Sequence, residues 1–152
     1  NEEKKTVRIY HCTGHRDYTM AGAAYKKLMV EHSVFSFYNE MEHLYEKATI
    51  VIARAGAGTL CEIMACGLPS ILIPYPHARR HQYYNANYLR ERNAALVLEE
   101  ETLSAVTLKR EVWGLLTDEQ RRNDLSVRAR ACYMQHASEF LADAVDAVRR
   151  QE

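Results

Sequence analysis

The sequence predicts an α/β fold in which a parallel sheet carries helices on both faces. Through the first two thirds of the 152 residues, short apolar runs alternate with stretches of helical periodicity, as in chains where a crossover helix follows each strand. The runs at 49–53 and 70–74 are continuously apolar, which is typical of strands buried on both faces. The length suits one compact domain.

The first part of the chain predicts two strands, a turn and two helices. Alternating or aromatic runs predict the strands. Apolar residues at helical spacing predict the helices, and a glycine-bearing polar stretch predicts the turn. In chain order these are a strand at 7–11, a turn at 13–17, a helix at 18–30, a strand at 34–37 and a helix at 41–48.

The remainder predicts three strands, of which the first two are buried, and a helix-rich C-terminal region. A helix opened by Thr59 and stopped at Gly67 joins the strands at 49–53 and 70–74. A helix at 81–92, with Tyr84 and Tyr88 toward the core, precedes a strand at 95–98. Three more helices follow, and their expected N-terminal residues are Thr102 or Ser104, then Asp118 with an end near 136, then Ser138.

Composition excludes several function classes. Lysine plus arginine and aspartate plus glutamate each number 20, so the formal net charge is zero, without the basic excess of a nucleic-acid-binding protein. No apolar run approaches a membrane-spanning length. The four cysteines form no CxxC pair and are interpreted as reduced, buried thiols of a cytosolic protein. We expect no metal site and no cofactor.

The segment with the strongest chemical signal is ARAGAGTLCE, residues 53–62. A buried strand runs into a glycine turn and then into a helix start, where free N–H groups and the helix dipole attract phosphate. Glu62 follows one turn later, where its carboxylate can accept two hydrogen bonds from a ribose diol. The alternative is structural: Thr59 and Glu62 have the spacing of a capping box.

Two further segments follow predicted strands. His81, Gln82 and Asn85 share one side of a helix's first turns, and amide side chains there suit sugar hydroxyls because they donate and accept. The alternative is a polar solvent-exposed face. At Phe37 and Tyr38, an aromatic ring could stack on a base, and the backbone of Tyr38 could read the edge of that base. In the alternative, Phe37 belongs to the core and Tyr38 is a half-buried surface residue.

Together, in this order, these segments resemble the MurG family of bacterial peptidoglycan synthesis. Its members transfer N-acetylglucosamine from UDP-N-acetylglucosamine to lipid I. The resemblance rests on residues 35–41, RAGAGTLCE at 54–62, ACGLP at 65–69, PYPH at 74–77 and HQYYNA at 81–86. It implies a GT-B architecture of two Rossmann-like domains facing a cleft, with this chain corresponding to most of the C-terminal, donor-binding domain.

The resemblance also implies roles for individual residues. Phe37 and Tyr38 would border the uracil, and Glu62 would bind the ribose hydroxyls, so the ligand role of Glu62 is favoured over the cap. The expected diphosphate neighbours are Gly56, Ala57, Gly58 and Thr59, with Arg54 leading into the turn, and the expected sugar neighbours are His81, Gln82 and Asn85.

Two departures from the family suggest a fragment. The family has a first strand and a glycine-rich loop ahead of the strand that matches 7–11, and this sequence shows neither. The family also has an N-terminal domain with the acceptor site, the membrane-facing patch and the general base, and that domain is missing too. Residues 1–152 are therefore expected to form a single donor domain that is inactive alone, and no catalytic base is assigned. Arg79 and Arg80 stand where the family often has an acidic or amide residue.

The implied activity is that of an inverting hexosyltransferase. An acceptor hydroxyl attacks the anomeric carbon while UDP departs, and helix N–H groups stabilise the leaving charge. The lipid-linked acceptor and the membrane are expected to be met only through the missing domain, with the parent enzyme peripheral on the cytoplasmic face of the inner membrane. Three alternatives stay open. The first is a stand-alone donor subunit, as in the two-part N-acetylglucosaminyltransferase that builds dolichol-linked chitobiose. The second is another UDP-sugar GT-B enzyme, such as an epimerase or a UDP-glycosyltransferase, and the third is a non-catalytic interaction module.

Overall fold

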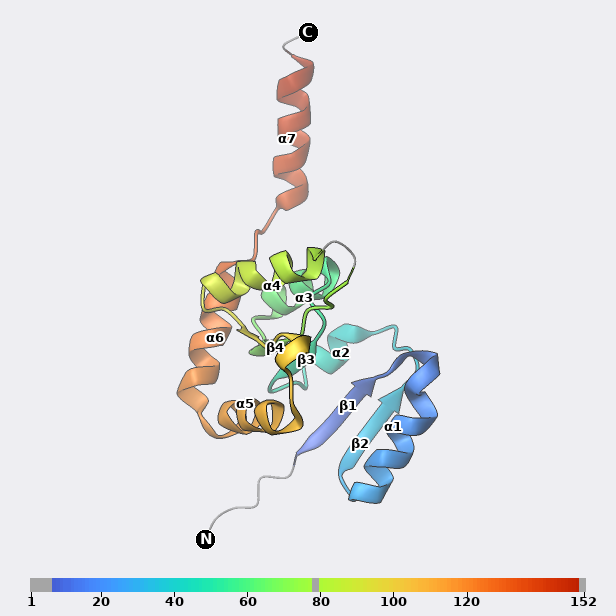
Figure 1. Ribbon diagram of the computed structural model, residues 1–152. Coiled ribbons are helices and arrows are strands. Elements are labelled where there is room, and N and C mark those ends of the chain that lie inside the picture. The colour runs from blue at the N-terminus through green and yellow to red at the C-terminus, as the bar shows by residue number, and fades with distance from the viewer. Residues whose placement is uncertain (1–6, 78–79, 151–152) are drawn as a thin grey trace. The chain divides into compact units, whose positions relative to one another are not determined.

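The computed structural model describes residues 7–77 and 80–150 (Figure 1). Arg79, one of the two arginines that depart from the family pattern, lies outside the described residues. The chain divides into two compact units, residues 1–47 and residues 48–152. Each unit is built from parallel strands joined by helices, and each is described by itself.

The first unit is a small parallel βαβ arrangement. β1 (Arg8–Cys12) pairs in parallel with β2 (Glu31–Phe35), and α1 (Gly14–Leu28) connects them. α2 (Met41–Tyr45) follows. The predicted turn at 13–17 is wrong, because the chain turns within two residues: Gly14 has a φ of +73°, and the Thr13 N–H donates to the Phe35 carbonyl at 2.9 Å. The helix therefore starts at Gly14 itself.

The second unit contains a three-stranded parallel sheet. Its strands β3 (Val51–Ala53), β4 (Ser70–Leu72) and β5 (Leu96–Val97) lie in the order β3-β4-β5. All three fall inside the apolar runs that predicted them. The ladder continues one bond further at the carboxyl ends, where the N–H of Ile73 donates to the Ala53 carbonyl at 2.9 Å.

Helices cover both faces of this sheet, as predicted. Ile71 of β4 packs with Leu115 and Leu125, which belong to α5 (Ala105–Thr117) and α6 (Glu119–Ala131). Its neighbour Leu72 is also fully buried and points to the opposite face, because successive strand residues alternate. That face carries α3 (Ala57–Cys66) and α4 (His81–Glu91), and Figure 1 shows the strands between these helices and α5.

The caps predicted for α5 and α6 are confirmed, and the cap predicted for the last helix is wrong. After the 3-10 turn η1 (Glu100–Thr102), the Ser104 hydroxyl accepts the Thr107 N–H at 3.1 Å. The Asp118 carboxylate accepts the Arg121 N–H at 2.9 Å. α6 ends at Ala131, before the predicted end. α7 (Ala137–Arg149) then follows His136, whose left-handed backbone makes the turn instead of a Ser138 cap.

Three expectations about burial are wrong. The strand in the run at 49–53 is not buried on both faces, because Ile52 of β3 is 46% exposed and its two neighbours in the strand are half-buried. Tyr84 and Tyr88 are 65% and 44% exposed, because α4 buries the stripe that contains Ala86 and Leu89; Tyr88 lies instead under the guanidinium of Arg92, whose Cζ is 3.8 Å from the ring centre. Three of the four cysteines are exposed and the fourth is half-buried. Their thiols are therefore not core residues.

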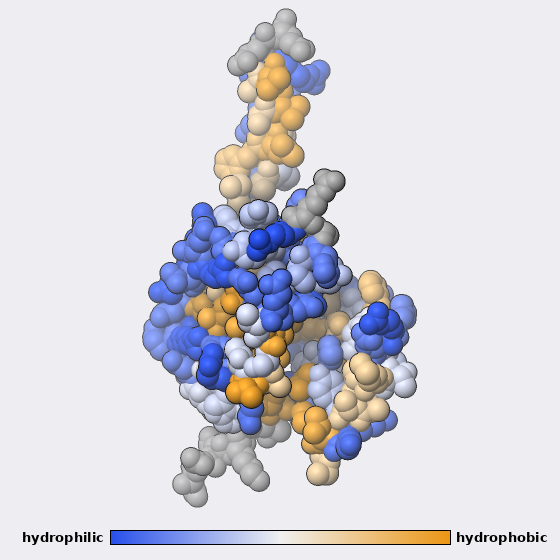
Figure 2. All heavy atoms as spheres, viewed as in Figure 1, coloured by the Kyte–Doolittle hydropathy of each residue, from blue (hydrophilic) through white to orange (hydrophobic). Residues whose placement is uncertain are grey.

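α7 contributes no buried residue. Figure 2 shows hydrophobic residues along it, and the exposed apolar side chains are those of Phe140, Leu141, Val145 and Val148. Among the described residues, no helix is long and apolar enough to cross a membrane.

Candidate functional site

The chain enters α3 through an extended glycine. Gly56 is the N-cap residue, with φ −68° and ψ 145° and no side-chain cap. Its carbonyl accepts the Leu60 N–H at 3.0 Å. The helix therefore opens at Ala57, and Thr59 is its third residue rather than its cap. The capping-box alternative for Thr59 and Glu62 is wrong, because that motif needs Thr59 at the N-cap position.

Packing does not require glycine at this helix start. A Cβ on Gly58 would meet no atom within 4 Å, and a Cβ on Gly56 would meet only the Thr59 hydroxyl, at 3.9 Å. Neither glycine has a positive φ. The two glycines instead leave the backbone N–H groups of the first turn open to close approach, which is the geometry that anion-binding helix starts use.

Glu62 lies on the same face of α3 as this first turn. It follows Thr59 by three residues and Gly58 by four, a spacing that places side chains on one face. Its side chain is exposed, whereas Leu60 and Ile63 are buried on the other side of the helix. A ligand at the helix start can therefore extend toward the Glu62 carboxylate.

The first turns of α4 reach the residue that precedes Gly56. Gln82 Oε1 accepts the Ala55 N–H at 3.1 Å and the Tyr75 N–H at 3.0 Å. Asn85 Nδ2 donates to the Ala55 carbonyl at 3.0 Å. The structure thus brings two of the three residues predicted near the sugar to the glycine turn. The third, His81, is the exposed first residue of α4.

Arg54 lies across the carboxyl edge of the sheet. Its guanidinium forms an ion pair with Glu100 and donates to the Ile73 carbonyl at 3.2 Å. Its Cζ also lies 5.5 Å from the centre of the Tyr75 ring. Sequence reasoning missed Glu100 and Tyr75 as partners of Arg54, because a contact between residues 46 positions apart leaves no periodic signal.

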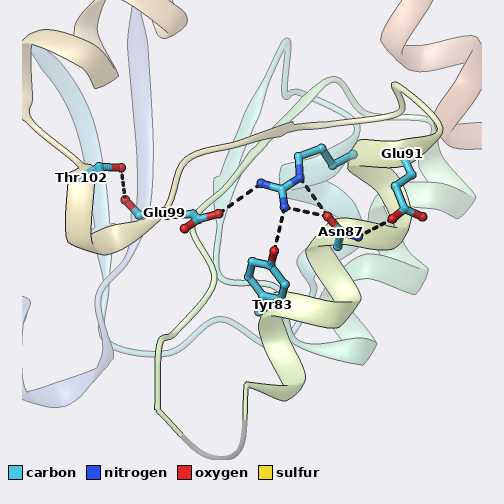
Figure 3. A network of polar contacts seen from close by, with 6 residues as sticks. Tyr83, Asn87, Glu91, Glu99 and Thr102 are labelled. Atoms are coloured by element: carbon cyan, nitrogen blue, oxygen red, sulfur yellow. Dashed lines mark hydrogen bonds and ion pairs between the residues drawn. The ribbon is translucent and has the colours of Figure 1, made fainter.

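A polar network around Arg90 fixes α4 to the segment after β5 (Figure 3). Arg90 donates to Asn87 at 2.6 Å, to Glu99 at 3.2 Å and to the Tyr83 hydroxyl at 3.3 Å. Burial opposes the charge of Arg90, but the hydrogen bonds to Glu99 and Tyr83 outweigh burial and raise the pKa of the guanidinium. This network was not predicted, and it holds the helix that carries Gln82 in place.

The loops that follow β4 and β5 form a shallow pocket at this edge of the sheet. Its side chains come from Tyr75, Arg80 and Tyr83 and from the acidic residues 99–101. The guanidinium of Arg80 lies over the Tyr83 ring, with Cζ 4.4 Å from its centre. The carboxyl ends of the three strands, the start of α3 and the start of α4 therefore meet in one region, where parallel sheets bind ligands.

Phe37 and Tyr38 belong to the first unit. Phe37 is 72% exposed, so the alternative that placed it in the core is wrong. Tyr38 is half-buried, and its ring centre lies 4.6 Å from that of Phe35. Phe37 thus offers an accessible aromatic face.

The described residues contain no group of three or more histidine, cysteine, aspartate or glutamate side chains arranged to hold a metal ion. The described residues instead provide backbone N–H groups, amides, carboxylates, arginines and exposed aromatic rings that a ligand can contact. That combination suits a ligand with anionic, hydroxyl-bearing and planar parts.

Comparisons with known proteins agree with this arrangement. Residues 1–147 match the model of the glycosyltransferase family 28 C-terminal domain. The UDP-N-acetylglucosamine--N-acetylmuramyl-(pentapeptide) pyrophosphoryl-undecaprenol N-acetylglucosamine transferase of Coxiella burnetii is 38% identical over 125 residues, which cover 82% of this chain and 35% of that protein. The Geobacter metallireducens protein of the same name is 36% identical over 150 residues, which cover 98% of this chain and 41% of that protein.

Solved structures give the same result. The crystal structure of Acinetobacter baumannii MurG superimposes with a TM-score of 0.83 at 26% identity, covering 92% of this chain and 43% of that one. The calicheamicin glycosyltransferase CalG4, at a TM-score of 0.62 and 16% identity, shares the fold. The chain spans only about two fifths of the length of these relatives. The resemblance to MurG is confirmed, and the chain belongs to glycosyltransferase family 28, whose C-terminal domain it matches.

Proposed function

We propose that this chain is the donor-binding part of a hexosyltransferase that moves N-acetylglucosamine from UDP-N-acetylglucosamine to lipid I. The observation that carries the proposal is the start of α3, where a glycine-bearing first turn without a side-chain cap opens at the carboxyl edge of a parallel sheet. The family match and the names of the Coxiella and Geobacter relatives support it.

Each part of the donor has a proposed partner. The N–H groups of the first turn of α3 bind the diphosphate, where the helix dipole adds to their attraction. The Glu62 carboxylate, on the same face of the helix, accepts hydrogen bonds from the ribose diol. The family resemblance alone assigns the exposed Phe37 and the half-buried Tyr38, both in the first unit, to the uracil. His81 approaches the sugar from the first turn of α4.

The contribution of this chain to transfer is electrostatic. When the acceptor hydroxyl attacks the anomeric carbon, the bond to the diphosphate breaks and negative charge grows on UDP. Fixed N–H groups at a helix start stabilise that charge without reorganising. We infer from the family resemblance that the general base, the lipid-linked acceptor site and the membrane contact lie outside residues 1–152, and we expect these residues alone to bind donor without transferring sugar. The parent enzyme works on the cytoplasmic face of the membrane.

Calorimetric titration tests the donor site. UDP and UDP-N-acetylglucosamine are titrated into the wild-type chain, into Glu62→Ala and into the control Glu119→Ala, which removes an exposed carboxylate from the start of α6. A carboxylate hydrogen bond is worth about 1.5–3 kcal/mol, so Glu62→Ala is expected to weaken both ligands roughly 10- to 100-fold. The control keeps wild-type affinity. Saturable binding that Glu62→Ala leaves unchanged would remove Glu62 from the site, and absence of binding by the wild type would refute the proposal.

A further inference from the structure

Ala55 is a fully buried residue whose two backbone polar groups are both bound by side chains of α4. It is 0% exposed, and it lies after the end of β3 and before the start of α3, so neither the sheet ladder nor the helix supplies its hydrogen bonds. Gln82 takes its N–H and Asn85 takes its carbonyl. Without these amides, a buried peptide would lose both partners, which natural structures rarely tolerate.

Gln82 also joins two loops through one atom. Its Oε1 accepts the N–H of Ala55, which follows β3, and the N–H of Tyr75, which follows β4. The last bond of the β3–β4 ladder is donated by Ile73 to Ala53. Beyond that point the two strands end, and side chains link the segments that follow them: Arg54 donates to the Ile73 carbonyl, and the Gln82 oxygen accepts one N–H from each segment. Both acceptor lone pairs of this oxygen are used in doing so.

Gly56, the N-cap residue of α3, comes directly after Ala55. The position and tilt of the first turn of α3 therefore depend on the bonds that hold Ala55. α4 is fixed in turn by the Arg90 network with Glu99 and Tyr83 (Figure 3). Restraint thus passes from the segment after β5, through α4, to the start of α3.

We propose that Gln82 and Asn85 are positioning residues for the phosphate-binding start of α3, in addition to any contact with the sugar. This rests on the proposed donor site and changes the role that the sequence predicted for the two amides. A sugar contact affects only ligands that carry the sugar. A positioning residue affects UDP, which lacks the sugar, as strongly as it affects UDP-N-acetylglucosamine.

The first readout is the hydrogen-exchange rate of the Ala55 and Tyr75 amides, which NMR measures in four variants. Gln82→Ala removes the acceptor, and both amides are expected to exchange at least about 10-fold faster, because buried N–H groups without partners exchange on local opening. Gln82→Glu keeps an acceptor oxygen and is expected to restore protection. Asn85→Ala frees the Ala55 carbonyl. Gln120→Ala, the same substitution at an exposed glutamine of α6 that bonds to Asp124, is the matched control.

The second readout is the affinity for UDP and for UDP-N-acetylglucosamine. Gln82→Ala is expected to weaken both by the same factor, about 10-fold. Weakened UDP-N-acetylglucosamine with unchanged UDP would overturn the proposal, and so would unchanged exchange of both amides. If Gln82→Ala fails to fold, Gln82→Met keeps the side-chain length without the acceptor and is measured instead. A wild-type chain that binds no UDP would refute the donor site, and amide exchange would still decide whether Gln82 holds the turn.

Discussion

Replacing Gly58 by alanine separates a ligand role from a structural role at the start of α3. Gly58 is helical and exposed, and an added Cβ would meet no atom within 4 Å. Because alanine is the better helix former, the substitution is expected to stabilise the fold by up to about 1 kcal/mol, which raises the melting temperature by a few degrees. If no ligand binds at the start of α3, the substitution increases stability and has no cost in function.

The same methyl group is expected to reduce donor binding. The Cα–Cβ bonds of a helix tilt toward its N-terminus, so a methyl group in the first turn projects toward a bound diphosphate. Losing one hydrogen bond to a charged ligand costs about 1.5–3 kcal/mol, or roughly a 10- to 100-fold weaker Kd. Gly58→Ala therefore gains stability and loses affinity for UDP.

Thermal melting and calorimetric titration of UDP check the two halves of this prediction. The control is Gly22→Ala in α1, where an added Cβ also meets nothing within 4 Å. It is expected to raise the melting temperature and to leave the Kd for UDP unchanged. A Gly58→Ala chain that binds UDP within about twofold of wild type would refute close approach of the diphosphate to this turn.

Three further predictions concern stability and are checked by urea unfolding. Gly67→Ala is expected to cost about 2 kcal/mol, because Gly67 has a φ of +63° and its Cβ would overlap the side chain of Arg130; a change below about 0.5 kcal/mol would contradict this. Leu115→Ala, which empties a fully buried position beside Ile71, is expected to cost about 2–5 kcal/mol, and a smaller loss would mean that the core closes over the cavity. Burial raises the pKa of Glu111, but hydrogen bonds from two arginines outweigh it and hold the pKa below its ordinary value of 4.5. The unfolded chain therefore binds a proton at Glu111 more readily than the folded chain does. The contribution of Glu111 to the free energy of unfolding is fully present above pH 4.5 and is lost as the pH falls through the folded-state pKa. Glu111→Gln should make the free energy of unfolding fall less over this pH range.

The strands and the sheet class could be predicted because their signals are local. Continuously apolar runs predict strands, and the runs at 49–53 and 70–74 contain β3 and β4, of which only β4 is buried at every residue. The start of α3 was placed two residues late, because threonine is a preferred cap whereas the true cap, Gly56, offers no side chain to recognise. In the same way, the positive φ of Gly14 allows a turn of two residues where composition predicts a turn of several residues.

Site chemistry was predictable by residue type and only partly by contact. The glycine turn and Glu62 lie on one helix, so their common face follows from spacing. Gln82 and Asn85 were expected to bind hydroxyls, and nothing in their local sequence indicates that a buried peptide 27 or 30 positions away takes their hydrogen bonds. These contacts depend on the order of the strands in the sheet, and local sequence patterns do not reveal that order.

Chemical-shift mapping of the ¹⁵N-labelled chain with UDP-N-acetylglucosamine tests the central claim most directly. The account predicts saturable shifts that are largest at the amides of Ala57, Gly58 and Thr59, the first turn of α3, and that UDP reproduces at the same amides. Saturable binding with shifts confined to other parts of the chain would contradict the account, and so would no shift at ligand concentrations that saturate related transferases.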